Sequence, residues 1–483
     1  MRLGGWFGVA CAVHAIGFSV SSASSQALDR SRRPIVPPDA PVLFPKTFSR
    51  TLANGIRVVV VEDHALPLVA VRTVSGVDSL DDPAGKEGLF ALTTAMLAEG
   101  TTSMSLDKQS AAIAALGYHE LRPSGFTTIS QNFQPSLALV ADMLMHPAFP
   151  EPALQRQKAA LVDAVHVRMQ ARGTAVRRLY LRQLFGQRGR LVRTMLPTDS
   201  SVSSLTREDV ESYYATFFGP STTTIIIVGD VGHTTAFADV ATAFMGWRAA
   251  RQPARMVAVA DPGSAEARTP TTIYLLDRPT ATQSEVYVGT TGPARTSRDF
   301  PALEVLARVL GATSASRIQK NLRERHAYTY SGTPGDVTWQ RAPDFSVIGG
   351  SVAMNVANVD SALVEWVGEL RRMREQPPTV QEMELARGSL RGALVTRLET
   401  IDGVARVLAL LVQNGLPTDF YATYLGRIDR VTAHDVLAAA VTYIDPQHLT
   451  IVVVGDRKRL EPALSAAGIA PIVVVDELGN PVG

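Results

Sequence analysis

Residues 205–231 read LTREDVESYYATFFGPSTTTIIIVGDV, and residues 431–457 read VTAHDVLAAAVTYIDPQHLTIVVVGDR. The two stretches align without gaps at a shift of 226 residues, with identity at Thr206/Thr432, Asp209/Asp435, Val210/Val436, Pro220/Pro446, Thr224/Thr450 and the Val-Gly-Asp triplets 228–230 and 454–456. In each copy, a threonine and an aspartate three residues later predict a capped helix start. After a proline break, the β-branched runs Ile225–Val228 and Ile451–Val454 predict buried strands.

The spacing of this repeat indicates a duplicated domain, because solenoid repeats recur roughly every 20–50 residues. We expect a first domain over residues 46–250 and a second over 271–470, followed by a tail over 471–483. The segment 251–270, RQPARMVAVADPGSAEARTP, is rich in Ala, Pro and Gly and is therefore predicted to be the linker.

Each half mixes strand and helix patterns. Short apolar runs predict strands at Ile56–Glu62, Leu68–Ser75, Thr127–Phe133, Thr272–Leu276, Glu285–Thr290 and Phe345–Val352. Longer helical patterns cover 86–98, 106–116, 136–145, 152–170, 300–310, 359–374 and 380–398, and Thr379 and Glu382 form a capping box at the start of the last one. We therefore predict an α+β fold of two homologous domains, each a mostly antiparallel β-sheet with helices packed on one face.

Composition excludes several classes of protein. The 483 residues are 46% hydrophobic and 19% charged, values typical of globular chains rather than disordered ones. The formal net charge is +2, whereas a nucleic-acid binder carries a strong and clustered basic excess. Nine histidines and one cysteine leave few soft metal ligands.

The amino terminus predicts export. Residues 1–25 begin with one basic residue, continue with an apolar run and end in small residues, the pattern of a cleaved signal peptide. Gly, His14 and several serines dilute the run, which argues against a membrane anchor. Only a short apolar stretch precedes Cys11, which argues against lipoprotein attachment there. Residues 26–45 are proline-rich and predict an extended leader. The mature chain is expected to be periplasmic or secreted, without a membrane span.

Two stretches of the first half resemble the pitrilysin/insulinase zinc peptidases, the family that includes mitochondrial processing peptidase. Residues 52–58, LANGIRV, are similar to the family's opening strand, and the likeness extends over about residues 46–470. Residues 88–101, GLFALTTAMLAEGT, keep the frame around the family's His-x-x-Glu-His zinc motif. This resemblance implies the processing-peptidase-like metallohydrolase fold in both halves.

The zinc motif itself is missing from that frame. Ala91 and Ala95 occupy the two histidine positions, and Thr94 occupies the position of the glutamate. Histidines at i and i+4 share one helix face and can hold one metal, whereas methyl groups cannot. In the family the glutamate acts as general base on zinc-bound water, and a threonine hydroxyl is too weak a base for that step.

The third metal ligand is also missing. In the family it is a glutamate further along the chain, and residues 156–165, RQKAALVDAV, correspond to that stretch. The alignment places Ala164 at the ligand position, although a slip of one residue would place Asp163 there. The histidines outside the predicted signal peptide stand at positions 64, 119, 146, 166, 233, 326, 434 and 448. No two of them are three or four residues apart, the spacing that would place a pair on one face of a helix. We therefore expect this chain to bind no metal.

The second half keeps a different motif of the family. Residues 311–332, GATSASRIQKNLRERHAYTYSG, match a stretch that contributes an arginine and, seven residues later, a tyrosine. The resemblance implies that Arg323 and Tyr330 hold the substrate backbone and the tetrahedral intermediate. Such a pair suits the task, since a guanidinium stays charged and a phenol donates one directed hydrogen bond. Ala327 replaces a glycine of the family, a substitution that can alter the backbone angle leading to Tyr330.

Arginine and tyrosine without the zinc ligands are typical of the non-catalytic subunit in heterodimeric members of the family. The resemblance thus implies a pseudoenzyme that holds peptides for a homologous, zinc-bearing partner subunit, and that is inactive alone. The alternative is a structural or binding scaffold like the core subunits of respiratory complexes. A peptidase active by itself would need a different metal site. Substrate sequence, the identity of the partner and the choice between homodimer and heterodimer stay open.

Overall fold

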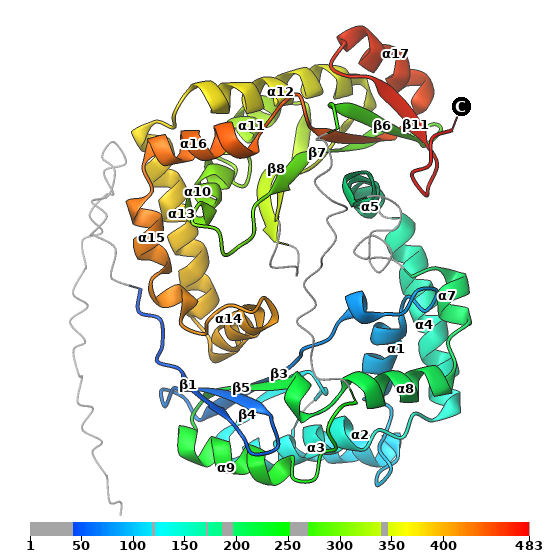
Figure 1. Cartoon of the computed structure of the whole chain (residues 1–483), viewed down its shortest axis with the longest axis vertical. Coiled ribbons are helices and arrows are strands. Elements are labelled where there is room, and N and C mark those ends of the chain that lie inside the picture. Colours follow the sequence, from blue (N-terminus) through cyan, green and yellow to red (C-terminus); the bar gives the residue numbers. More distant parts are fainter. Residues whose placement is uncertain are drawn as a thin grey trace, which may run out of the picture. The chain divides into compact units, whose positions relative to one another are not determined.

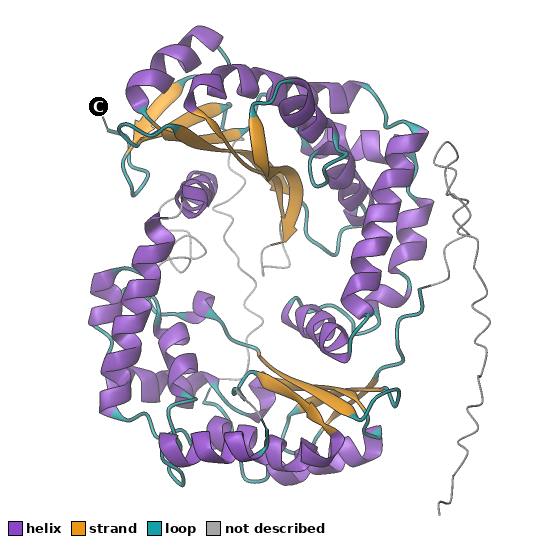
Figure 2. Ribbon diagram, turned by 180° about the vertical axis from the view of Figure 1, so that it is seen from behind, coloured by secondary structure: helices purple, strands orange, loops and turns teal. Residues whose placement is uncertain are grey.

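The computed structural model describes residues 42–117, 121–170, 172–185, 197–251, 269–339 and 346–482. The predicted signal peptide, nearly all of the leader and most of the predicted linker lie outside these ranges. Two β-sheets, one in each half of the sequence, organise the described residues, and helices pack on both of them (Figures 1 and 2).

The first sheet has the strand order β1-β2-β5-β3-β4. Its strands are β1 (Phe48–Thr51), β2 (Arg57–Glu62), β3 (Leu68–Ser75), β4 (Gly125–Ile129) and β5 (Thr223–Gly229). Only β2 and β5 pair in parallel, and the other neighbours are antiparallel. The central strands are runs of Val and Ile buried on both faces, which explains why they are continuous apolar stretches rather than alternating ones.

The second sheet has the order β11-β6-β10-β7-β9-β8. Its strands are β6 (Thr272–Asp277), β7 (Gln283–Gly292), β8 (Thr329–Trp339), β9 (Ser346–Asn355), β10 (Thr450–Gly455) and β11 (Ile472–Val475). β6 pairs in parallel with β10 and β11, and the remaining pairs are antiparallel. The predicted fold class, α+β with two mostly antiparallel sheets, is confirmed.

The repeated stretches occupy equivalent places in the two sheets. β5 and β10 are inner strands that follow the helices α8 (Arg207–Phe217) and α16 (Ala433–Tyr443). Both helices begin at the predicted capping boxes, where the backbone N–H of Asp209 or Asp435 donates to the threonine hydroxyl at 3.1 Å. Local sequence therefore fixes the same helix-to-strand unit in each half.

The first half contributes α1 (Leu89–Met96), α2 (Leu106–Ala115), α3 (Phe133–Met145), α4 (Glu151–Gln170), α5 (Arg172–Phe185), α7 (Asp199–Ser203), α8 and α9 (His233–Ala243). The second half contributes α10 (Phe300–Leu310), α11 (Arg317–Gln319), the π-helical turn η4 (Lys320–Arg325), α12 (Val359–Glu375), α13 (Val380–Leu398), α14 (Ile401–Gln413), α15 (Tyr424–Arg430), α16 and α17 (Arg457–Ala467). The capping box of Thr379 and Glu382 begins α13 as predicted.

Two helices that the sequence analysis did not predict, α5 and α14, each pack on the sheet of the other half of the sequence. α5 belongs to the first half of the sequence but packs on the second sheet, where Leu179 and Tyr180 share a core with Tyr287 and Val452. α14 belongs to the second half but packs on β3 and β5 of the first sheet, where Asp402 forms an ion pair with Arg72. Each sheet is therefore covered by one helix from the other half.

Some predicted boundaries differ from the structure. The strand predicted over 127–133 ends at Ile129, because residues Ser130–Asn132 form a 3-10 turn that leads into α3 at Phe133. The predicted tail 471–483 contains β11, whose backbone hydrogen bonds extend the second sheet beside β6. Among the described elements, β1 and β8 were also not predicted. They are polar edge strands, whose composition gives a weak strand signal.

Candidate functional site

The helix α1 carries Ala91, Thr94 and Ala95, the positions that the sequence resemblance matched to a zinc motif. Its start is fixed by the buried Asp82, whose two carboxylate oxygens accept the N–H groups of Gly88 at 2.8 Å and Phe90 at 2.7 Å. Burial raises the pKa of Asp82 to about 7. Gly88 has a φ of 102°, a left-handed angle that favours glycine and turns the chain into the helix. The frame of the motif is therefore intact.

The side chains on α1 do not fit a metal ion. Ala91 is exposed and Ala95 is half-buried, and a methyl group offers no lone pair. The Thr94 hydroxyl donates to the Phe90 carbonyl one turn earlier, at 2.8 Å. Over the residues that the structure describes, no three His, Cys, Asp or Glu side chains come together as a metal site would require. The donor set of α1 is therefore unsuited to zinc chemistry.

The helix α4 packs against α1 and carries Asp163 and Ala164, the two candidates for the predicted third-ligand position. Ala164 is half-buried there, whereas the neighbouring Asp163 is exposed. The two helices are joined by Glu99, which is buried just beyond α1 and accepts hydrogen bonds from Arg156 and Gln157 of α4. These contacts between α1 and α4 involve no metal ligand.

Arg323 and Tyr330 lie on η4 and β8 of the second half, close in sequence to one another. The side chains of both are exposed, that of Tyr330 to 83%. Neither side chain forms a hydrogen bond or an ion pair with another residue of the described part of the chain. A long guanidinium and a phenol left to solvent are free to bind an extended ligand, by charge and by hydrogen bonding.

The turn between them keeps a glycine-like backbone although it lacks the glycine. Ala327 has a φ of 54°, in the left-handed region that L-residues other than glycine avoid. The Tyr328 N–H donates to the Leu322 carbonyl at 2.8 Å and so closes the end of η4. Ala327 therefore adopts a backbone angle that suits glycine better, and the alanine bears the strain.

Tyr330 points away from the strand ladder because it is the extra residue of a β-bulge. Its neighbours Thr329 and Ser331 pair with the consecutive residues Met354 and Ala353 of β9, which leaves Tyr330 without a partner. The buried Thr329 hydroxyl fixes this bulge, since it donates to the Ala353 carbonyl at 2.7 Å. Bulges commonly redirect a side chain toward a binding site.

A buried network of hydrogen bonds joins η4 to the helix α12. The Asn321 amide donates to Glu369 at 2.7 Å and to Glu365 at 2.8 Å, and both acids belong to α12. Arg372, on the same helix, donates to Glu369 at 2.6 Å. Because Asn321 is buried, this network attaches the helix that carries Arg323 to α12.

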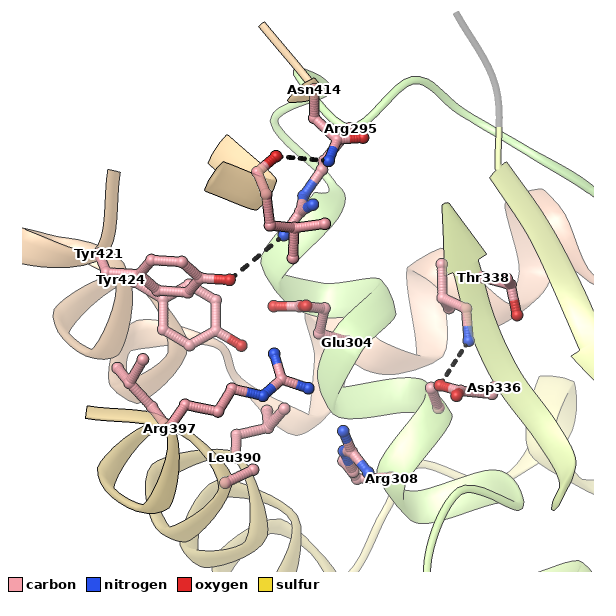
Figure 3. A pocket seen from close by; sticks show the side chains of 15 residues that line it. Arg295, Glu304, Arg308, Asp336, Thr338, Leu390, Arg397, Asn414, Tyr421 and Tyr424 are labelled. Atoms are coloured by element: carbon pink, nitrogen blue, oxygen red, sulfur yellow. Dashed lines mark hydrogen bonds between the residues drawn. The ribbon is translucent and has the colours of Figure 1, made fainter. Parts of the chain in front are cut away.

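A cavity of about 320 Å³ lies apart from these residues, between α10, β8, α13 and α14 (Figure 3). The sequence analysis missed its charged residues Arg295, Glu304, Arg308, Asp336 and Arg397. One signal was present, because Glu304 interrupts the otherwise apolar start of α10, FPALEVL. That position faces the inside of the fold, where a carboxylate is costly without a partner.

Comparison with known proteins identifies related sequences over most of the chain. The family described as "Peptidase M16 inactive domain" matches residues 204–390. An uncharacterized zinc protease of Streptomyces coelicolor is 26% identical over 406 residues, which covers 81% of this chain and 85% of that protein. The uncharacterized zinc protease YmxG of Bacillus subtilis is 20% identical over 357 residues, covering 72% of this chain and 84% of that one.

Solved structures share the fold at lower identity. A peptidase M16 inactive domain from Pseudomonas fluorescens superposes with a TM-score of 0.73 at 19% identity, covering 85% of this chain and 98% of that one. The first half of the periplasmic protease PqqL from Escherichia coli gives 0.70 at 13% identity, covering 91% and 98%. A chain of Complex III2 from Candida albicans gives 0.66 at 18% identity, covering 87% and 99%.

Among the described residues, no helix has both the length and the apolar character needed to cross a membrane.

Proposed function

Since this chain is an M16-type peptidase homologue with an M16 inactive domain over residues 204–390, we propose that it is the non-catalytic, substrate-holding subunit of a heterodimeric zinc peptidase. The zinc would belong to a homologous partner subunit that carries the His-x-x-Glu-His motif. The substrate would be a peptide or an unfolded segment, which the pair degrades or processes.

One observation carries this proposal. The chain displays Arg323 and Tyr330 on a braced turn and a bulge, both exposed and without described partners, while Ala91, Thr94, Ala95 and Ala164 offer no ligand to a metal. A single preorganised donor aimed at a developing oxyanion contributes roughly 3–4 kcal/mol to catalysis. Arg323 and Tyr330 contribute little to the packing of this chain, because both are exposed, but they could bind a substrate held by a second subunit.

The test combines this chain with a homologous subunit that carries the zinc motif. Cleavage of an unstructured, fluorescence-quenched peptide should need both chains, and metal analysis should find zinc only in the partner. Arg323→Ala should lower kcat/KM of the pair roughly 100-fold. Arg325→Ala is the matched control, because Arg325 is an exposed arginine of the same turn.

The tyrosine is tested in the same way. Tyr330→Phe should lower kcat/KM with little change in KM, while Tyr328→Phe should leave both constants unchanged. If Arg323→Ala and Tyr330→Phe behaved like their controls, the substrate-holding role would be refuted. A stable complex whose activity ignores both residues would instead support the scaffold, the alternative function.

We further propose that the chain is exported, either to the periplasm or out of the cell. The signal-peptide pattern of residues 1–25 supports this proposal. The mature protein should begin close to Ala23 or Ala27 when its first residues are sequenced. A mature chain that still begins at Met1 would contradict it.

A further inference from the structure

The cavity of about 320 Å³ in the second half is lined by charged side chains, which distinguishes it from a packing defect (Figure 3). Its charged residues are Arg295, Glu304, Arg308, Asp336 and Arg397. Neither Arg323 nor Tyr330 lines it, so a ligand bound here would be independent of the proposed function. A void left by imperfect packing would be apolar and dry, whereas this one gathers both signs of charge.

Glu304 is the acidic group of the cavity. Its Oε2 atom is buried and has no hydrogen-bond partner among the described residues, while a hydrogen bond between the Tyr424 side chain and the carboxyl lowers the pKa of Glu304 against the effect of burial. In Figure 3 the carboxyl points across the cavity toward Tyr424, and burial raises the pKa of Glu304 to about 7. A buried carboxylate oxygen without a partner costs on the order of 1–3 kcal/mol, which a ligand's hydrogen-bond donor would recover.

Arg308 and Arg397 form no direct ion pair with a carboxylate of the described structure, although Arg308 is near enough to Glu304 and Asp336 to lower the pKa of each against the effect of burial. Arg308 reaches only the Ala312 carbonyl, at 3.5 Å, and Arg397 forms no hydrogen bond or ion pair with a described residue. Arg295 differs from both, because it contacts the Tyr421 hydroxyl at 3.4 Å and the rings of Phe300 and Phe420. Two guanidinium groups are therefore available to a carboxylate.

The rest of the lining is mixed, with the polar Thr338 and Asn414 beside several apolar side chains. Leu390 and Leu394 of α13 and Leu410 of α14 also line the cavity. Tyr421 and Tyr424 add aromatic faces near Glu304. The cavity is at the lower end of the range of roughly 300–1,000 Å³ that small-molecule sites occupy.

We propose that this cavity binds a small zwitterion, namely a free amino acid or a dipeptide with apolar side chains. Its carboxylate would pair with Arg308 and Arg397, its ammonium group would donate to Glu304, and its side chain would lie against the leucines. The guanidinium forks suit a carboxylate's two oxygens. Three arginines repel a metal cation, and Glu304 repels a simple dianion, so a ligand with both charges fits best.

The experiment is titration calorimetry of the full-length chain with L-leucine and L-leucyl-L-leucine. Acetylated and amidated leucyl-leucine, which lacks both charges, and inorganic phosphate serve as comparison ligands. At least one of the two zwitterions should bind, and neither comparison ligand should. At about pH 7 binding should also release protons, because an ammonium group beside Glu304 favours the ionised carboxylate.

Variants separate the cavity from other sites. Arg397→Gln and Glu304→Gln should each weaken binding by roughly 10- to 100-fold, the loss of one charge-assisted hydrogen bond. Arg397 is exposed on α13, so its replacement should leave the fold unchanged by circular dichroism. Arg298→Gln is the control, since this arginine is 96% exposed and outside the cavity.

Three outcomes would overturn the proposal. They are binding of neither zwitterion, equal binding of the blocked dipeptide or of phosphate, and unchanged binding by the Arg397→Gln variant in a folded protein.

Discussion

The guanidinium of Arg317 holds both carboxylate oxygens of Glu382, with Nε to Oε1 at 2.7 Å and Nη2 to Oε2 at 2.9 Å. Glu382 also accepts the Thr379 N–H at 2.8 Å and so completes the capping box of α13. Arg317 therefore attaches α11, which leads directly into η4, to the start of α13. This contact helps to fix the turn that carries Arg323, as the hydrogen bonds of Asn321 to α12 also do.

Arg317→Gln should destabilise the protein by about 1–3 kcal/mol, because a largely buried bidentate pair loses one partner. These hydrogen bonds lower the pKa of Glu382 to about 2, so its contribution is present above about pH 4.5 and is lost as the pH falls toward 2. Urea unfolding at several pH values measures both effects. Arg298→Gln, which removes an exposed arginine, should match the wild type, and an equal loss in that control would contradict the assignment.

Ala327→Gly should stabilise the protein by about 1 kcal/mol. The left-handed φ of 54° strains an alanine but not a glycine, and this relief exceeds the extra flexibility of the unfolded chain. Thermal unfolding measures the change. Ala111→Gly provides the opposite control, since it places glycine inside α2 at an exposed site and should cost about 1 kcal/mol. A loss of stability at both positions would show that Ala327 is unstrained in solution.

Restoring the missing ligands should create a zinc site. The combined change Ala91→His, Thr94→Glu, Ala95→His and Ala164→Glu places three ligands and a base on the packed helices α1 and α4. Metal analysis after dialysis should find about one zinc per chain, against none in the wild type. Replacing the fourth change by Asp163→Glu should bind more weakly, since Asp163 faces solvent. A folded quadruple variant that binds no zinc would refute the positional match.

Because of Glu304, the free energy of unfolding should decrease as the pH rises. Burial raises its pKa to about 7 in the folded state, so the native protein keeps a proton that the unfolded chain releases above about pH 4.5. Between about pH 5 and pH 8 the free energy of unfolding should therefore fall by up to about 3 kcal/mol. The neighbours Arg295 and Arg308 moderate this loss.

Glu304→Gln should remove this pH dependence, because the amide does not titrate. Glu384→Gln, at an exposed position of α13, should keep it. Unfolding by urea across this pH range checks both variants. An unchanged slope in Glu304→Gln would show that another group is responsible.

The local elements could be predicted from sequence because their signals are local. The capping boxes at Thr206, Thr432 and Thr379 begin helices as expected, and the β-branched runs form inner strands. The helix predicted over residues 86–98 likewise contains α1. These predictions depend on neighbours within a few residues or on alternation along one element.

Other features depend on contacts between distant segments. Sequence periodicity does not tell that α5 covers the second sheet or that α14 covers the first, because an amphipathic helix fits either sheet equally well. Nor does it tell that Tyr330 is the extra residue of a bulge, which depends on its pairing with β9. The sequence by itself determined the α+β class and the capped helix and inner strand of each repeated stretch. Only the tertiary structure decided which helix covers which sheet, how Arg323 and Tyr330 are displayed, and that Glu304, Arg308 and Arg397 line one cavity, because long-range packing brings these residues together.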